Sequence, residues 1–381
     1  MPLVREILFV AGEASGDMHA AAVAHALAAR RAPFALTGVG GDRMQQAGVQ
    51  LLEHASKLSV IGFAGVLGHL PMLWRLLGRL RERFESGSVA AAVLVDYGGF
   101  NLGFVAAAAK AAGVPVLYYI TPQVWASRPG RIATLRKTVS RAAVIFPFEE
   151  TLLRAHGVDA TFVGHPLTEA AATLPDRAEA RRTLGLDADR PVLALFPGSR
   201  RQEVARHVVP FVETARDLER RIPGLQVVVS HAPTVTIDAG TVPYPLVRAP
   251  SLTLLRAADA ALCKSGTTTL EAAVTGCPLV LAYRMGGLDY AIARRLVRIP
   301  DIGLVNIVAE RRIAPEFVQD DFVPARVADA LAPLLDRGSA ERARMVEALA
   351  AVRAKLGAPG AADRVADMVL ELAQGAGGGA R

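Results

Sequence analysis

The chain has 381 residues, with 43 Lys and Arg against 36 Asp and Glu, so its formal net charge is +7 at pH 7. At roughly 150 residues per domain, this length predicts about two domains. The composition, 52% hydrophobic and 21% charged, excludes a disordered chain. A disulfide scaffold is excluded as well, because Cys263 and Cys277 are the only cysteines and their spacing suits no metal site.

The excess positive charge comes almost entirely from arginine, and alanine is also abundant. This combination indicates a compositional bias more than a nucleic-acid partner, so we expect no such partner. No uncharged apolar run approaches the ~18 residues that cross a bilayer, and the run at residues 7–11 is too short for a signal peptide. We therefore expect a soluble cytoplasmic protein, with attachment to a membrane surface left open.

Short β-branched runs alternate with alanine-rich helical stretches along the whole chain. In the first half, the predicted strands are residues 7–11, 35–39, 91–96, 115–120, 143–148 and 161–163. In the second half, they are residues 191–196, 225–230, 245–247, 260–263, 278–283 and 304–307. Nearly continuous apolar strands that alternate with helices predict an α/β fold with parallel, doubly wound sheets.

The boundary between two such domains is expected near residue 168. His165 and Pro166 end one strand signal, and Pro175 and Asp176 form a turn before the next amphipathic helix. We therefore expect one domain over residues 1–168 and a second over 169–354. The last helices, at 355–374, could pack back on the first domain, and the glycine-rich residues 375–381 should be disordered.

Nearly every unusual polar cluster follows a predicted strand directly. The clusters are residues 12–17, 96–101, 121–128 and 164–166 in the first domain, and 197–200, 264–271 and 283–285 in the second. In doubly wound sheets, ligands bind outside the carboxyl ends of the strands. Two such edges facing each other would form a cleft between the domains.

Residues 12–17 connect a strand to an alanine-rich helix, so their amides can face an anion. They match neither the dinucleotide-binding fingerprint nor the P-loop, and a structural tight turn explains them equally well. Residues 197–200 also stand between a strand and a helix. There Ser199 can donate a hydrogen bond and Arg200 can pair with a phosphate, or the segment is only a helix cap with a solvated arginine.

Residues 265–271 offer successive hydroxyl groups at the start of a helix, where the helix dipole favours a diphosphate. Glu271 would lie about one turn inside this helix, within reach of a ribose diol. A capping box would also explain Glu271, but three consecutive threonines exceed what capping requires. Asp187 and Asp189, by contrast, precede a strand and are read as a turn, so no metal site is expected.

Asp96 ends a very apolar strand and precedes Gly98 and Gly99. A carboxylate at this place can act as a general base if partial burial raises its pKa. Capping of the next helix is the alternative role for Asp96.

Residues 60–84 hold more apolar side chains than one buried helix stripe uses. We expect Pro71 to start a helix whose core face is formed by Leu73, Leu76, Leu77, Leu80 and Phe84. The other apolar side chains, beside Arg75, Arg79 and Arg83, suit an anionic membrane surface, although a fully buried helix remains the alternative. The expected membrane patch is Phe63, Val66, Leu67, Leu70, Met72, Trp74 and Arg75.

Taken together, these motifs resemble the bacterial lipid-A-disaccharide synthases. The similar segments, in chain order, are residues 11–17, 96–101, 122–126, 147–149, 164–165, 195–200, 265–267 and 283–285, and Asn306. The resemblance runs nearly end to end. Two departures stand out: Gly99 replaces the second aspartate of the family's Asp-x-Pro-Asp-Phe-Asn motif, and Ser127 replaces a tryptophan.

The resemblance implies the GT-B fold, with two Rossmann-like domains. It implies inverting, metal-independent transfer of a sugar from UDP-2,3-diacylglucosamine to 2,3-diacylglucosamine 1-phosphate, with no cofactor. The C-terminal domain would hold UDP, and the N-terminal domain would hold the lipid acceptor at the inner face of the cytoplasmic membrane. A homodimer is possible, since some members of the family are dimers.

The resemblance also implies roles for individual residues, with Asp96 as the catalytic base. The expected donor-site residues are Ser199, Arg200, Ser265, Gly266, Thr267, Thr268, Glu271, Tyr283, Arg284 and Asn306. The expected acceptor-site residues are Gly12, Glu13, Ser15, Asp17, Gln123, Trp125 and His165.

Two other classes of function stay open at this point. Another UDP-N-acetylglucosamine enzyme of the same fold is one, either the peptidoglycan N-acetylglucosaminyltransferase or a 2-epimerase. The epimerase needs no lipid acceptor, so the apolar stretch at 60–74 argues against it. The other class is a non-catalytic protein that binds a nucleotide sugar or a membrane surface.

Overall fold

The computed structural model describes residues 5–59, 66–238, 240–287, 290 and 300–375. Contacts within the chain divide it into two compact units. Unit 1 comprises Met1–Pro166 and Ala358–Arg381, and unit 2 comprises Leu167–Gly357. Each unit contains a parallel sheet with helices on both faces, so the predicted α/β doubly wound fold is confirmed.

The sheet of unit 1 has seven strands in the order β3-β2-β1-β4-β5-β6-β7. Their bounds are β1 Glu6–Ala11, β2 Ala35–Gly40, β3 Gln50–His54, β4 Val89–Val95, β5 Val116–Tyr119, β6 Arg141–Val144 and β7 Ala160–Phe162. β1 and β4 are buried along their whole length, because helices cover both faces of the sheet. The carboxyl ends of these two strands, Ala11 and Val95, are paired neighbours at one edge.

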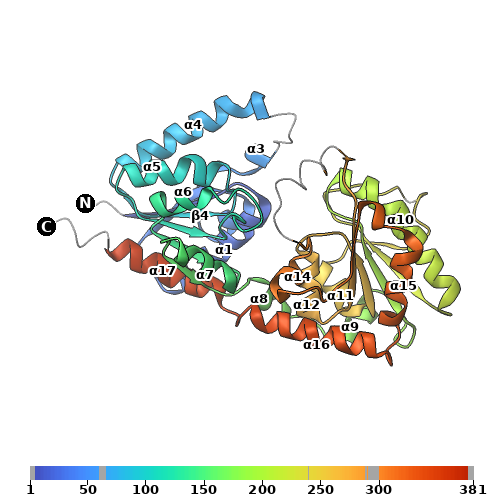
Figure 1. The fold of residues 1–381 in the computed structure, drawn as a ribbon. Coiled ribbons are helices and arrows are strands. Elements are labelled where there is room, and N and C mark those ends of the chain that lie inside the picture. Colours follow the sequence, from blue (N-terminus) through green and yellow to red (C-terminus); the bar gives the residue numbers. More distant parts are fainter. Residues whose placement is uncertain (1–4, 60–65, 239, 288–289, 291–299, 376–381) are drawn as a thin grey trace. The chain divides into compact units, whose positions relative to one another are not determined.

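Two apolar clusters cover the two faces of this sheet. One contains buried residues of α4 (Val66–Glu85), η1 (Asn101–Val105), α5 (Ala106–Ala111), α6 (Arg131–Thr138) and α7 (Pro147–Ala155). The other contains residues of α1 (Ala14–Ala29), α2 (Asp42–Gln46) and α17 (Ala361–Gly375). The C-terminal α17 is thus part of the core of unit 1, and Figure 1 shows it on the opposite side of the sheet from α4 and α5.

The sheet of unit 2 has six strands in the order β10-β9-β8-β11-β12-β13. Their bounds are β8 Val192–Phe196, β9 Gln226–Ser230, β10 Leu246–Val247, β11 Ala260–Cys263, β12 Leu279–Tyr283 and β13 Glu316–Val318. Figure 1 shows α10 (Arg201–Arg221) and α15 (Pro324–Leu335) on one side, and α11 (Ser251–Ala257) and α12 (Thr268–Thr275) on the other. The remaining helical segments are α3 Ser56–Ser59, α8 Leu167–Ala172, α9 Arg177–Thr183, α14 Leu304–Ala309, η2 Gln319–Asp321 and α16 Ala340–Lys355.

Some sequence predictions of secondary structure were wrong. The predicted strand at 304–307 is helix α14, in which Val305 and Val308 are buried. Strands β3 and β13 were not predicted. Pro71 does not start a helix, since α4 begins at Val66 and continues through it. Gly375, placed in the expected disordered tail, ends α17, and residues 376–381 lie outside the described part.

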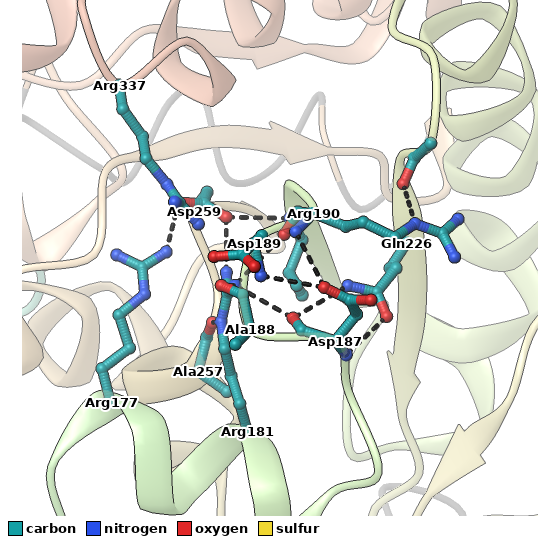
Figure 2. A network of polar contacts seen from close by, with 12 residues as sticks. Arg177, Arg181, Asp187, Ala188, Asp189, Arg190, Gln226, Ala257, Asp259 and Arg337 are labelled. Carbon is teal, nitrogen blue, oxygen red and sulfur yellow. Dashed lines mark hydrogen bonds and ion pairs between the residues drawn. The ribbon is translucent and has the colours of Figure 1, made fainter.

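A network of charged side chains lies at the amino edge of the unit 2 sheet (Figure 2). Asp259, just before β11, accepts hydrogen bonds from Arg177, Arg181 and Arg337. Arg181 also donates to the backbone carbonyls of 187, 188 and 190. The segment with Asp187 is a turn at this edge, as predicted, because its carboxylate accepts the backbone N–H groups of residues 189 and 190.

Candidate active site

Asp96 directly follows the carboxyl end of β4, where it is half-buried. Asp96 and Tyr97 both have left-handed backbone conformations, with φ of +48° and +51°. Residues other than glycine rarely adopt this conformation, and it persists only where the surrounding contacts hold it. Shortly after Tyr97, residues Asn101–Val105 form the π-helical turn η1, a feature that is frequent at functional sites.

Buried side chains fix the backbone of Asp96. The Asn101 amide nitrogen donates to the carbonyl of Asp96 at 2.9 Å and to that of Val10 at 3.1 Å, so it joins the ends of β1 and β4. The Tyr118 hydroxyl donates to the same Asp96 carbonyl at 2.8 Å. Neither residue was among the predicted site residues, although Asn101 belongs to the motif that drew attention to Asp96.

The environment of Asp96 makes its carboxylate a stronger base. Burial raises its pKa, and the nearby charge of Glu13 raises it further, while a backbone hydrogen bond from Tyr97 acts in the opposite direction. Gly12 lies close to the Tyr97 ring: a Cβ atom at Gly12 would stand 2.4 Å from this ring. The structure thus brings Gly12, Glu13 and Asp96 together at one edge of the unit 1 sheet.

Asp17, one of the expected acceptor residues, binds backbone groups of unit 1. Its carboxylate is buried and accepts the backbone N–H groups of Gly41, Arg43 and Met44, at 2.7, 3.1 and 3.1 Å. These bonds hold the start of α2. Ser15, in the first turn of α1, is exposed.

Three other expected acceptor residues follow strands of this sheet: Gln123 and Trp125 lie after β5, and His165 lies after β7. Trp125 donates its indole N–H to Glu149 at 2.9 Å, and burial raises the pKa of Glu149 to about 7. His165 lies beside the Phe146 ring at 5.3 Å, and its pKa is lowered to about 4, by burial and by the charge of His19. Gln123 is exposed.

Unit 2 has a cavity of about 230 Å³ at the carboxyl edge of its sheet. Four predicted donor-site residues line it: Ser199, Thr267, Thr268 and Glu271. The other lining residues are Phe196, Gly198, Ser230, Ala232, Ser251 and Lys264. Burial raises the pKa of Glu271, while hydrogen bonds with Ser251 and Thr268 act in the opposite direction. The cavity therefore combines hydroxyl groups, backbone at the start of α12 and the half-buried carboxylate of Glu271.

Lys264 also lines this cavity, although it was not among the expected donor-site residues. It follows β11, lines the cavity, and places its ammonium group 3.3 Å from the Glu203 carboxylate. Glu203 also accepts the backbone N–H groups of Ser199 and Arg200. A signal was present, because Lys264 immediately precedes the Ser-Gly-Thr motif.

Several predicted donor residues do not line the cavity. The Arg200 side chain is 83% exposed, and the Ser265 hydroxyl donates to the carbonyl of Ile302 at 2.7 Å. Gly266 is not among the lining residues, and a Cβ atom at its position would stand 2.9 Å from the Lys264 Nζ. Arg284 donates to the carbonyl of Phe322 at 3.0 Å.

Tyr283 and Asn306 are also absent from the residues that line the cavity. Tyr283 stacks on His207, with ring centroids 5.3 Å apart. Asn306 is fully buried, and its amide is satisfied by Ile313, Ala314 and Glu316. The polar atoms of Asn306 thus hold the segment before β13, and its expected contact with the donor stays a prediction.

The expected membrane patch is only partly described. Phe63 lies outside the described residues, and for Val66, Leu67 and Leu70 only the helical backbone of α4 is described. Met72 is partly buried against the core, whereas Trp74 is 54% exposed and contacts Phe104, which is 43% exposed. Arg75 is exposed.

Two other arginines of α4 pair with acidic residues of unit 1. Arg79 pairs with Glu53 at 3.2 Å, and Arg83 pairs with the buried Glu6 at 2.9 Å. Both charges are therefore paired within unit 1, and the expected role of these arginines at a membrane stays a prediction. Within the described ranges, no helix is long and apolar enough to cross a membrane, and no cluster of His, Cys, Asp and Glu suited to a metal is present.

Comparisons with known proteins agree on one family. The family model described as lipid-A-disaccharide synthetase matches residues 7–358. The lipid-A-disaccharide synthase of Myxococcus xanthus is 42% identical over 375 residues, which cover 96% of this chain and 97% of that protein.

Solved structures show the same fold at much lower identity. A putative UDP-N-acetylglucosamine 2-epimerase from Listeria monocytogenes matches with a TM-score of 0.64 at 12% identity, covering 95% of each chain. MurG from Acinetobacter baumannii matches with a TM-score of 0.57 at 15% identity, covering 97% of this chain and 99% of that one. These likenesses agree with the GT-B fold.

Proposed function

The chain belongs to the lipid-A-disaccharide synthase family of glycosyltransferases, and from that premise we propose that it transfers the sugar of UDP-2,3-diacylglucosamine to 2,3-diacylglucosamine 1-phosphate. The products are the β(1→6)-linked disaccharide 1-phosphate and UDP. The nearly full-length family match favours this reaction over the peptidoglycan-type transferase, the epimerase and a non-catalytic binder.

The half-buried carboxylate of Asp96 is the observation that carries the mechanism. Asp96 accepts the proton of the acceptor 6-hydroxyl while that oxygen forms a bond to the anomeric carbon of the donor. The bond from this carbon to the diphosphate breaks in the same step, so the configuration inverts and UDP leaves. The raised pKa of Asp96 supports the role, since a more basic carboxylate accepts a proton more readily.

The cavity of unit 2 is the proposed donor site. Its hydroxyl groups and the backbone N–H groups at the start of α12 are suited to the negative charge that develops on the departing diphosphate. Glu271, about one turn inside α12, is placed to accept hydrogen bonds from a ribose. Acceptor contacts are assigned to Glu13, Ser15, Gln123, Trp125 and His165 in unit 1.

Contact with the cytoplasmic face of the inner membrane is also part of the proposal. The acceptor and the donor both carry acyl chains, which favour a membrane surface. The exposed pair of Trp74 and Phe104, with Arg75 next to it, supports this placement, because aromatic side chains beside a cation suit an anionic interface.

The decisive experiment supplies both diacylated substrates to the purified protein and follows UDP release and disaccharide formation by mass spectrometry. We expect stoichiometric formation of both products. Tight UDP binding without disaccharide would instead favour the non-catalytic binder. Transfer of N-acetylglucosamine to a peptidoglycan precursor, or epimerisation of UDP-N-acetylglucosamine, would identify one of the other two enzymes.

A further inference from the structure

We propose that Lys264 is the cationic side chain that contacts the diphosphate of the nucleotide-sugar donor, and that Glu203 holds its ammonium group in place. The inference rests on the proposed function, because it assumes that the cavity of unit 2 receives the donor. It goes further by assigning the contact to Lys264, which was not among the expected donor-site residues.

The position of Lys264 is the first support. Lys264 follows the buried strand β11, and its side chain is only 17% exposed. It shares the cavity lining with the hydroxyl groups of Ser199, Thr267 and Thr268. A partly desolvated ammonium group among hydroxyl donors is well suited to phosphate oxygens.

Glu203 fixes this ammonium group without using all of its donors. The Nζ atom of Lys264 lies 3.3 Å from one Glu203 oxygen, and the other oxygen accepts the N–H groups of Ser199 and Arg200 at 3.2 and 3.4 Å. An ammonium group has three N–H donors, and Glu203 is its one hydrogen-bond partner in the part of the chain that the structure describes. Donors therefore remain for a ligand.

Gly198, after β8, and Gly266, after β11, leave room for the ion pair of Lys264 and Glu203. A Cβ atom at Gly266, where φ is +152°, would stand 2.9 Å from the Lys264 Nζ. One at Gly198, where φ is +135°, would stand 2.6 Å from the Cβ of Glu203. Both glycine-containing loops thus approach the Lys264–Glu203 pair closely, and the pair joins them at the edge of the cavity.

The charge of the cavity gives the third support. Among the described residues that line it, Lys264 is the cation and Glu271 is the carboxylate. Arg200, which the sequence favoured for the diphosphate, is largely exposed, and its guanidinium lies 3.7 Å from Glu203. A diphosphate that enters this cavity therefore meets Lys264 as the side-chain cation already in place.

The test compares the binding of UDP and uridine to the full-length protein by calorimetry or ligand-observed NMR. Lys264→Met removes the charge and keeps the length of the side chain. Because a charged hydrogen bond to phosphate is lost, we expect UDP binding to weaken by about 10- to 100-fold while uridine binding stays within about 3-fold. Lys264→Arg should retain most of the UDP affinity.

Lys110→Met, an exposed lysine on α5, serves as the matched control and should change neither affinity. If Lys264 only ties the two loops together, Lys264→Met will weaken UDP and uridine by the same factor, and this result overturns the inference. Unchanged UDP binding also overturns it. Should Lys264→Met unfold, Lys264→Gln replaces it with the same expectation. A wild-type protein that binds neither ligand would refute the proposed donor site itself.

Discussion

At the scale of single residues, the position of the Asp96 carboxylate depends on contacts made by the backbone of Asp96 and by its neighbour Tyr97. Two successive left-handed residues, Asp96 and Tyr97, cost about 1–3 kcal/mol each unless the surrounding structure holds them. Asn101 and Tyr118 hold the carbonyl of Asp96, and Gly12 makes room for Tyr97. Small changes around the base can therefore reduce activity while the fold persists.

Asp96→Asn tests the base directly. The amide cannot accept the proton, so kcat should fall by about 100-fold or more while UDP binding stays unchanged.

The pH profile gives a second test of Asp96. In the wild type, kcat/KM should fall as the pH decreases through the raised pKa of Asp96. The midpoint of this acidic limb of the profile should lie above the ordinary aspartate pKa of about 3.9. Glu13→Gln removes one cause of the shift and should move the limb to lower pH. A limb that does not move would contradict the assigned role of the Glu13 charge.

Gly12→Ala tests the close contact with Tyr97. The new methyl group would overlap the aromatic ring, so Tyr97 must move and take Asp96 with it. We expect a loss of kcat of about 10- to 100-fold and a stability loss of about 1–3 kcal/mol, measured by steady-state kinetics and urea unfolding. Gly78→Ala in α4, where the added methyl meets no atom within 4 Å, is the control and should leave kcat unchanged. Full activity of Gly12→Ala would show that the loop adapts.

Ser199 and Thr267, which motifs marked in the sequence, both line the cavity of unit 2. The sequence did not separate ligand-facing polar groups from those that satisfy the backbone. Asp17 accepts backbone N–H groups 24 to 27 residues away, and Asn306 accepts N–H groups seven and eight residues away. Only the folded structure shows which N–H groups these side chains bind. Lys264 belonged to a predicted polar cluster but not to the expected donor-site residues, because a lysine after a strand normally lies in solvent.

At the scale of elements, prediction succeeded where the local pattern and the environment agreed. Central strands such as β1, β4 and β8 are apolar along their whole length because both faces are covered. The edge strands β3 and β13 are partly polar and short, so their pattern is weak. Residues 304–307 have a strand-like composition, yet packing against α12 and α16 makes them helical.

The pair of elements α4 and η1 carries the prediction for membrane contact. Trp74→Ser and Phe104→Ser together should weaken binding to vesicles that contain anionic lipid by about 10-fold or more, because two exposed aromatic side chains are lost from the interface. Co-sedimentation with vesicles measures the effect. The thermal midpoint should hardly change, since both side chains are exposed. Val209→Ser, an exposed apolar residue of α10, is the control. Unfolding of the double variant would show instead that the pair belongs to the core.

At the scale of the whole molecule, strand β11 links the proposed donor site to the network that stabilises unit 2. Lys264 follows its carboxyl end, at the cavity, and Asp259 precedes its amino end, at the opposite edge of the sheet. Asp259 joins α9 to the sheet, because it accepts from Arg177 and Arg181 and also from the backbone N–H group of Val192 (Figure 2). Stability and ligand binding should therefore respond separately to changes at the two ends of this strand.

Asp259→Asn leaves Arg181, whose side chain is 2% exposed, without its counter-ion. We expect a stability loss of about 3–5 kcal/mol in urea unfolding at pH 7, while UDP binding by the folded variant stays within about 3-fold.

Burial alone would raise the pKa of Asp259, but the hydrogen bond from Arg337 and the charge of Arg177 lower it overall. The wild type therefore has the full contribution above the unfolded pKa of about 3.9 and loses it as the pH falls through the lower folded value, so the difference between the two proteins should shrink in acid. Asp329→Asn, which breaks an exposed ion pair with Arg221, is the control and should cost less than about 1 kcal/mol. Equal stability of Asp259→Asn and wild type at pH 7 would contradict the network's role.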